Sequence, residues 1–438
     1  YVAYRRCFFA FTLEKPMDFV YTGVIRYRIE ANRMKVIIIG GGASGMMAAL
    51  RASTLPNAQV TVLERQSRVG RKLLATGNGR CNLTNRNLTS QNYHGATPSF
   101  VQPALSAFSV DDTLAFFQNL GLLTVTEPSG RVYPRSDQAG SVVDVLRFAL
   151  ESVGVTVVCG CEIESVRKKA RGYQVTAVDG KGWFADRLIL AAGGCAGRKL
   201  GGTELGYRLL EQLGHTCSPL YPSLTQIKTE PTWVRALKGV RADGRLSLKA
   251  GGHTAAFTEG ELQFTEFGVS GPVAFALSRA VSESDGVKTL LIDFCRDYAP
   301  DTLLSLLQAR RERFAQVSAE ELFTGLLQTR LGKTIVRRAG IDVHKNLCGV
   351  TDDELRDAIA LTKCYALDVT GLMGMDSAQV TAGGILTSQF RADTLESRIA
   401  PGVFACGEVL DIDGDCGGYN LQWAWSSGHL AGALGTQE

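Results

Sequence analysis

The sequence lacks the patterns that mark several common protein classes. Its eleven cysteines include no CxxC pair and no regular framework, which favours a reducing compartment over a disulfide scaffold. The five histidines lack the spacing of metal ligands, and no apolar run approaches the roughly 18 residues of a membrane-spanning helix. A net charge of +4 does not by itself indicate a nucleic-acid partner. We therefore expect a soluble, cytoplasmic protein that holds no metal and acts on a small molecule.

The chain begins with an aromatic- and arginine-rich segment, residues 1–33. Its short apolar core has no small-residue cleavage site after it, so a signal peptide is not expected. We predict a poorly ordered extension with Met34 as the natural start. The 438 residues include 48 glycines and are 45% hydrophobic. Such a length and composition favour two or three globular parts joined by many turns.

A dinucleotide-binding pattern follows directly after Met34. The β-branched run at 35–39 is typical of a strand buried on both faces of a parallel sheet. A glycine-rich turn follows it, then a predicted helix at 46–54 and a second predicted strand at 58–64. The order strand, glycines, helix, strand and acid is far more specific than the glycines alone.

Each element of this pattern has a physical role. Gly40 allows the tight turn, Gly42 lets backbone N–H groups approach a pyrophosphate, and Gly45 lets the helix pack closely on the strand. Glu64 ends the second strand, where it can accept hydrogen bonds from an unphosphorylated ribose, which favours FAD or NAD over NADP. The predicted contacts of this segment are Gly40, Gly42, Ala43, Ser44, Gly45, Glu64 and Arg65.

The segment "GRKLLATGNGRCNLTN", residues 70–85, distinguishes between the two cofactors. An NAD site usually leads straight into another βα unit, whereas in this chain a long polar, glycine-rich excursion leaves the ribose end of the site. Such a segment can line a large cofactor, with Arg71 and Lys72 near phosphate and amides at the flavin edge. We therefore predict FAD.

Two motifs carry a resemblance to a known family. Residues 71–85, together with "GEVLDIDGDCGGYNLQWAWSSGHLAG" at 407–432, closely resemble the BaiN/YhiN-like NAD(P)/FAD-dependent oxidoreductases, also described as aminoacetone-oxidase-family flavoproteins. That family is related to the succinate dehydrogenase and fumarate reductase flavoproteins. The resemblance extends from Met34 to the C-terminus. It implies a non-covalently bound FAD and reduction of an enoyl-type C=C bond, as in 3-oxo steroid or bile-acid intermediates, with NAD(P)H as electron donor.

The resemblance also implies a set of cofactor contacts. The backbone near Ile163 would contact adenine, and the turn after the strand that ends near Leu190 would pass close to the cofactor. The helix from Tyr419 would direct its N-terminus at the flavin pyrimidine edge and stabilise the negative charge of the reduced ring. The further implied contacts are Thr76, Gly77, Asn78, Gly79, Arg80, Cys81, Asn82, Ile163, Ala192, Gly193, Gly407, Glu408, Gly418, Tyr419, Asn420 and Leu421. No catalytic acid or base can be assigned.

The fold predicted is α/β, with a discontinuous Rossmann-like FAD-binding domain interrupted by an insertion. Short strands at 154–194 form a meander that returns to the sheet, and a helix follows at 202–215. Alternating patterns then predict antiparallel β structure, followed by helical periodicity. The predicted parts are 1–33, the extension; 34–216, the first part of the FAD-binding domain; 217–300, the β domain; 301–370, the helical subdomain; and 371–438, the second part of the FAD-binding domain.

Some residues and functions stay open. Cys81 has no partner cysteine at CxxC spacing, which favours packing over redox chemistry. Arg135 is either a surface arginine or a contact for an acidic or carbonyl substrate. Ser270–Pro272 is either a structural turn or a turn that faces the active cleft. A second NAD(P) site at 192–197 is disfavoured because no acid completes it. Two alternatives to the reductase remain: an oxygen-using amine or aminoketone oxidase, and an RNA-associated or non-catalytic flavin-binding protein.

Overall fold

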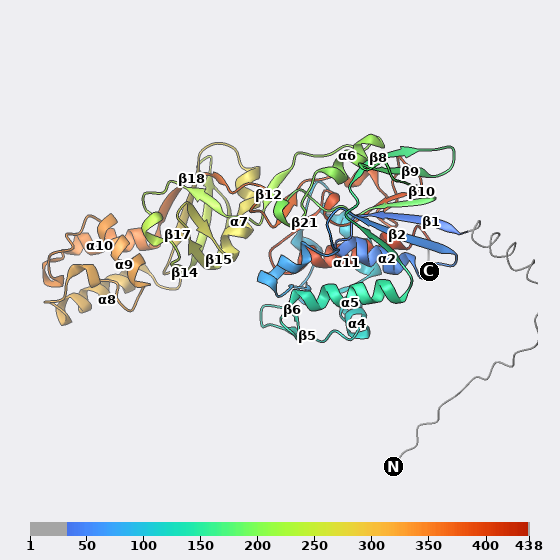
Figure 1. The fold of residues 1–438 in the computed structure, drawn as a ribbon. Helices are drawn as coiled ribbons and strands as arrows, with labels where there is room; N and C mark the ends of the chain where they lie inside the picture. Colours follow the sequence, from blue (N-terminus) through green and yellow to red (C-terminus); the bar gives the residue numbers. More distant parts are fainter. Residues whose placement is uncertain (1–32, 437–438) are drawn as a thin grey trace, which may run out of the picture.

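The computed structural model describes residues 33–436. The predicted extension therefore lies outside the described residues, except for Arg33. Three regions follow one another along the long axis of the molecule (Figure 1): a nucleotide-binding domain, a β-barrel, and a group of helices at the far end. Within residues 33–436, no helix combines the length and the apolar character needed to cross a membrane.

A five-stranded parallel sheet forms the centre of the nucleotide-binding domain. Its strands, in spatial order, are β20 (Val403–Ala405), β11 (Arg187–Leu190), β1 (Met34–Ile39), β2 (Ala58–Glu64) and β7 (Thr156–Cys159). Both strands predicted at 35–39 and 58–64 are confirmed. Because the strands are parallel, their carboxyl ends meet at one edge, where ligands of such sheets bind.

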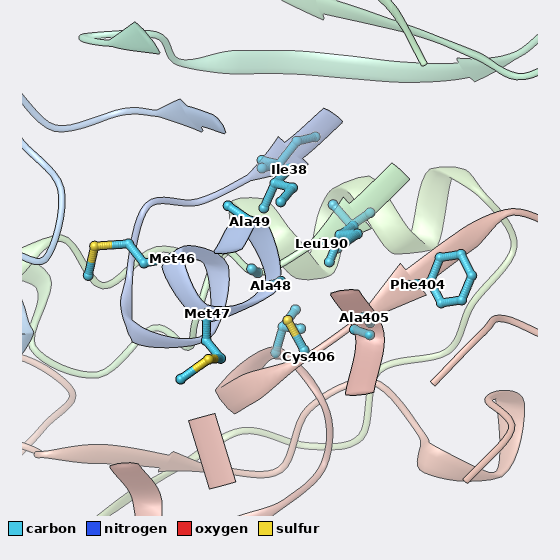
Figure 2. Close-up of a cluster of buried hydrophobic side chains, with 14 of the residues drawn as sticks. Ile38, Met46, Met47, Ala48, Ala49, Leu190, Phe404, Ala405 and Cys406 are labelled. Atoms are coloured by element: carbon cyan, nitrogen blue, oxygen red, sulfur yellow. The ribbon is translucent and has the colours of Figure 1, made fainter. Parts of the chain in front are cut away.

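Four helices contribute apolar side chains to the core of this domain, and the first of them packs directly on β1, β2 and β11. They are α2 (Ala43–Ala52), α5 (Ala139–Ser152), α6 (Leu205–Gln212) and α11 (Tyr419–Gly432). Figure 2 shows part of the core, in which Ala48 and Ala49 of α2 lie beside Ile38 and Leu190 of the sheet. Small alanine side chains on α2 let the helix lie close to the β-branched strands.

Smaller elements complete this domain. The predicted meander is β8 (Ile163–Lys168), β9 (Tyr173–Ala177) and β10 (Gly182–Ala185), and the chain then returns to the main sheet at β11. The remaining elements are β3 (Thr84–Asn85), β5 (Thr124–Thr126) and β6 (Arg131–Pro134) in one sheet, β4 (Tyr93–His94) paired with β21 (Asp413–Gly414), and the helices α3 (Gln102–Ala107) and α4 (Val110–Asn119).

The insertion contains a closed antiparallel barrel. Its strands are β13 (Ile227–Thr229), β16 (Gly268–Ser270), β15 (His253–Phe264), β14 (Arg241–Ala250), β17 (Lys288–Asp293) and β18 (Tyr365–Leu372). Helix α7 (Pro272–Glu283) packs against the barrel and was not predicted. Strand β18 comes after the helical segment and closes the barrel, whereas the predicted bounds put residues 365–370 in the helical subdomain and 371–372 in the FAD-binding domain.

Three helices pack beside the barrel: α8 (Pro300–Arg313), α9 (Thr329–Arg338) and α10 (Asp352–Lys363). They share one hydrophobic core with the barrel, separate from the core of the nucleotide-binding domain. The chain enters and leaves the insertion through β12 (Tyr221–Ser223) and β19 (Val380–Ala382), which pair in an antiparallel manner. The observed architecture confirms the predicted fold class, a Rossmann-type α/β domain with inserted antiparallel strands and helices.

Glycines let the first and last helices of the domain touch. A Cβ atom at Gly428 of α11 would lie 2.4 Å from the backbone oxygen of Ser44, and one at Gly432 would lie 2.6 Å from that of Ala48. Neither position has room for a side chain, because the obstacle is backbone. This contact joins the two ends of a discontinuous domain.

We expect Gly428→Ala to destabilise the nucleotide-binding domain by about 2 kcal/mol, since the added methyl group forces α11 away from α2. Gly140→Ala in α5 is a matched control, because a Cβ there meets nothing within 4 Å, and it should be neutral or up to about 1 kcal/mol stabilising. Urea unfolding followed by the fluorescence of the buried tryptophans of α11 measures both. Equal stability of the two variants would contradict the proposed helix contact.

Candidate functional site

The glycine turn after β1 has the geometry of a dinucleotide site. Gly40 has φ +107°, and a Cβ there would lie 2.3 Å from the Ala191 oxygen. A Cβ at Gly45 would lie 1.9 Å from the Gly40 oxygen, so α2 begins in direct contact with the turn. By contrast, a Cβ at Gly42 would meet nothing within 4 Å. The turn is closed toward the sheet and open at Gly42, at the N-terminus of α2, where phosphate binds in such folds.

Glu64 fixes the shape of this turn. Its Oε2 accepts a hydrogen bond from the Gly41 N–H at 2.7 Å, and its Oε1 accepts one from the Gln66 N–H at 2.7 Å. A carboxylate has about four acceptor sites, so both oxygens retain capacity for ribose hydroxyls. Glu64 therefore links the second strand, the glycine turn and the adjoining segment.

The basic residues near the turn contact protein groups. Arg65 donates to the Gly201 oxygen at 3.2 Å, and Arg71 donates to Gln66 Oε1 at 2.5 Å. Lys72 Nζ forms an ion pair with Glu408 Oε2 at 2.8 Å, although the two residues are 336 positions apart. The other oxygen of Glu408 accepts from the Thr381 N–H. The ion pair thus joins residues 70–85 to the motif that begins at Gly407.

The segment from Thr76 to Cys81 needs its glycines for conformational reasons. Gly77, Asn78, Gly79 and Cys81 all have positive φ, between 57° and 87°, a region that most side chains avoid. The Thr76 hydroxyl donates to the Leu73 oxygen, and the Cys81 N–H donates to the Thr76 oxygen. Cys81 is completely buried, and burial raises the pKa of its thiol to about 12, which makes it unreactive at neutral pH.

Arg80 points toward the small β3–β6–β5 sheet. Its Nε donates to Asp137 at 2.5 Å, its second terminal nitrogen pairs with Glu127 at 3.0 Å, and the guanidinium lies 3.9 Å from the ring centre of Tyr133. These contacts anchor the segment. Arg135 is exposed, and its backbone N–H donates to the Leu123 oxygen.

The first turn of α11 meets residues 82–84. A Cβ at Gly418 would lie 2.5 Å from the Thr84 oxygen and 2.9 Å from Asn82 Oδ1. Tyr419, Asn420 and Leu421 follow, and their N–H groups belong to the helix end that has no intrahelical acceptor. Asn82 Oδ1 is a buried acceptor without a hydrogen-bond partner. A buried acceptor beside a helix N-terminus fits the N–H and carbonyl groups along a flavin pyrimidine edge.

Several residues that fasten α11 were not predicted. Gln422 is completely buried and accepts from the Thr84 hydroxyl at 2.6 Å while it donates to Thr113 Oγ1 at 2.8 Å. The indole N–H groups of Trp423 and Trp425 donate to the Gly407 and Leu83 oxygens, respectively. The family-like run in the sequence contained these residues, but their partners lie more than 300 positions away, apart from Gly407.

The remaining predicted contacts lie along the carboxyl edge of the sheet. Ala192 and Gly193 follow β11, and a Cβ at Gly193 would meet nothing within 4 Å. A Cβ at Gly407 would lie 2.5 Å from Ser44 Oγ, so the end of β20 touches the start of α2, which also includes Ala43. Ile163 begins β8. It lies just beyond Cys161, whose backbone N–H donates to the backbone oxygen of Glu64. The structure therefore brings these residues together along one edge, while the Arg80 side chain is paired with Asp137 and Glu127.

A cavity of about 590 Å³ lies behind the glycine turn. It is bounded by α5 and the edge strand β7, with Val69 between the cavity and the turn. Its lining includes Val143, Leu150 and Cys159. The open Gly42, the N-terminus of α2 and the unpartnered Asn82 oxygen are not part of the lining of this cavity.

A charged cluster not predicted from the sequence lies beside the first turn of α11. Asp413 and Arg279 form an ion pair, and His94 Nε2 lies 2.8 Å from Asp415 Oδ1. Asp411 Oδ2 accepts from the Ala96 N–H at 3.2 Å. The alternating acids of "DIDGD" at 411–415 were the available signal, although Arg279 comes from the barrel.

Comparison with known proteins places the chain in context. The HI0933-like protein Rossmann domain family matches residues 34–434. A 3-dehydro-bile acid delta(4,6)-reductase of Clostridium scindens is 38% identical over 402 residues, 91% of this chain and 98% of the relative. A ribosomal RNA dihydrouridine synthase of Escherichia coli is 29% identical over 397 residues, 90% of this chain and 96% of the relative. A solved 3-ketosteroid delta1-dehydrogenase of Sterolibacterium denitrificans is 15% identical, with TM-score 0.47, over 92% of this chain and 99% of that chain. The resemblance seen in the two sequence motifs is confirmed.

Gly42→Ala should weaken flavin binding about tenfold to hundredfold, because its methyl group enters the open side of the turn. Gly42 has φ −79°, so the apoprotein should fold as the wild type does. Gly45→Ala is the matched variant, and its methyl group collides with the Gly40 oxygen, so it should also lower the thermal midpoint. Flavin titration and thermal unfolding of the apoproteins separate the effects. A destabilised Gly42→Ala apoprotein, or one that binds flavin normally, would contradict the assignment.

Glu64→Ala should weaken FAD binding about tenfold to hundredfold, because two backbone N–H groups and the ribose lose a charged acceptor. Glu64→Gln keeps one acceptor oxygen and should fall between the alanine variant and the wild type. Quenching of FAD fluorescence on addition to apoprotein gives the dissociation constants. Unchanged FAD retention in Glu64→Ala would remove Glu64 from the site.

Proposed function

Since the chain belongs to the HI0933-like family and is a flavoprotein oxidoreductase, we propose that it binds FAD and uses NAD(P)H to reduce a C=C bond of a small organic substrate. The observation that carries the proposal is the 38% identity to a 3-dehydro-bile acid delta(4,6)-reductase over 98% of that protein. The ten cysteines of the described residues are free, which supports a reducing, cytoplasmic setting.

The residues of the sheet edge fit a bound FAD. When bound, FAD would supply the hydride chemistry of the reaction. The open side of the turn at Gly42 and the N-terminus of α2 would hold the pyrophosphate, and Glu64 would hold the ribose. The first turn of α11 and Asn82 Oδ1 would contact the pyrimidine edge. A helix N-terminus there favours the reduced, negatively charged ring, which makes the cofactor easier to reduce.

The names of the relatives describe one kind of chemistry. A delta(4,6)-reductase of a 3-dehydro substrate and a dihydrouridine synthase both saturate a C=C bond conjugated to a carbonyl group. We take the conjugated enone as the substrate class. Ribosomal RNA is the second candidate, favoured by the 28% and 29% identities to two ribosomal RNA dihydrouridine synthases. The steroid-like substrate is preferred because the reductase relative is more similar.

Anaerobic spectroscopy tests the proposal. The purified holoprotein should show flavin absorbance that NADH or NADPH bleaches. A 3-oxo-4,6-diene steroid should restore this absorbance in the absence of oxygen. Rapid recovery in air without response to the enone would favour the oxidase alternative. Recovery with unmodified ribosomal RNA alone would favour the second candidate. A protein that takes up no FAD would contradict the central claim.

A further inference from the structure

The charged cluster lies where the barrel meets the nucleotide-binding domain. Arg279 belongs to α7, which lies on the side of the barrel toward β21 (Figure 1). Its guanidinium pairs with Asp413 of β21 and, through Nε, with Glu283 at 2.9 Å. Within residues 33–436, no group of three or more His, Cys, Asp or Glu side chains is arranged to hold a metal ion. The chemical groups that the cluster offers to a ligand are a guanidinium, an imidazole and carboxylates.

Asp413 is unusual within the cluster. It is 1% exposed, and its Oδ2 has no hydrogen-bond partner while Oδ1 binds Arg279. Burial raises the pKa of Asp413, and the Arg279 guanidinium opposes that rise. A buried carboxylate costs desolvation energy that one ion pair does not fully offset. The main effect of this ion pair is therefore to hold the Arg279 side chain, which comes from the insertion, against the nucleotide-binding domain.

The cluster is fastened to the part of α11 that faces the cofactor site. The Asn420 side chain accepts from the Gly414 N–H at 2.8 Å and donates to the Gly414 oxygen at 2.7 Å. The hydroxyl of Tyr93, next to His94, donates to the Tyr419 oxygen at 3.0 Å. Strands β4 and β21 pair directly, with His94 opposite Asp413. The cluster thus lies between the first turn of α11 and the barrel.

His94 has the surroundings of an acid. The hydrogen bond to Asp415 raises its pKa, burial lowers it, the charges of Asp415 and Asp413 raise it, and Arg279 lowers it, with a net rise. Asp415 is itself held by Asn92, whose Nδ2 donates to Oδ2 at 3.0 Å. The His94 side chain is 37% exposed, so a molecule in the junction can reach it. Because Nε2 is engaged with Asp415, Nδ1 is the nitrogen left for a substrate.

We propose that this junction binds the carbonyl end of the substrate, with Arg279 stabilising its oxygen and His94 donating the proton that completes the reduction. The assignment rests on the proposed function. A bound, reduced FAD would supply the hydride for the β-carbon of the enone, and Arg279 would stabilise the enolate that forms on the substrate as the π electrons shift to the carbonyl oxygen. The enolate then re-forms its carbonyl as the α-carbon takes the proton from His94 Nδ1. Neutral His94 regains a proton from water, so atoms and charge balance.

The pH dependence of substrate reduction tests the donor. Protonated His94 is the active form, so the rate of enone-driven reoxidation should fall as pH rises through its pKa. His94→Gln should be about 100-fold slower at low pH and lose that dependence. Asp415→Asn should move the fall to lower pH, because the carboxylate raises the pKa of His94. His344→Gln, at an exposed histidine of the insertion, is the matched control and should behave as wild type.

Binding of 4-chlorophenol to the oxidised holoprotein gives a readout without turnover, since its phenolate mimics an enolate. Wild type should bind the phenolate with a long-wavelength flavin band, and His94→Gln and Arg279→Lys should bind it about tenfold more weakly. Flavin content and the rate of reduction by NAD(P)H should match the wild type in the control His344→Gln. Wild-type protein that binds no phenolate, or variants that bind it equally, would overturn the site. If an enone still reoxidised such protein, the junction site would be wrong and the reductase proposal would hold. If the phenolate bound as expected but no enone reacted, the reductase proposal would be wrong.

Discussion

The close contact of α2 with α11 is the constraint on which the rest of the structure depends. Gly428 and Gly432 bring the last helix against the backbone of the first. The contact fixes where the first turn of α11 lies relative to the glycine turn. The hydrogen bonds of Gln422 and Trp425 to residues 83–84 then set the position of the polar segment. Residues 82–84 and the first turn of α11, which are far apart in the sequence, therefore lie side by side at the candidate site.

The ion pairs in this region position distant segments of the chain more than they stabilise the fold. Lys72 with Glu408 and Arg279 with Asp413 each join segments far apart in the chain. Burying such charges costs energy that their attraction offsets only in part, so apolar side chains of similar size would stabilise the fold at least as well. Charged side chains do, however, keep a fixed direction, and they preserve a polar surface at the edge where a charged cofactor and a carbonyl substrate would lie.

The local features of the site could be predicted from the sequence, and the distant contacts could not. The strands at 35–39 and 58–64 follow from apolar runs, and the roles of Gly40 and Gly45 follow from spacing that any such turn requires. Arg80 is paired with Asp137 and Glu127, which lie 57 and 47 positions away, so no local pattern could show these contacts. Helix α7 and strand β18 were missed for a related reason. Their apolar residues are buried by partners that lie far away in the sequence and come together only in the closed barrel.

The paired crossings β12 and β19 bear on how the chain folds. Because these strands lie side by side, the barrel and its helices form an excursion whose two ends are adjacent. Once that excursion has folded, it acts as a short, stiff link between the halves of the nucleotide-binding domain, and the entropy lost in joining those halves falls accordingly. This topology favours folding of the insertion before completion of the main sheet. Strand β20 follows the insertion in the chain, so it can pair with β11 at low entropic cost only after the insertion has folded.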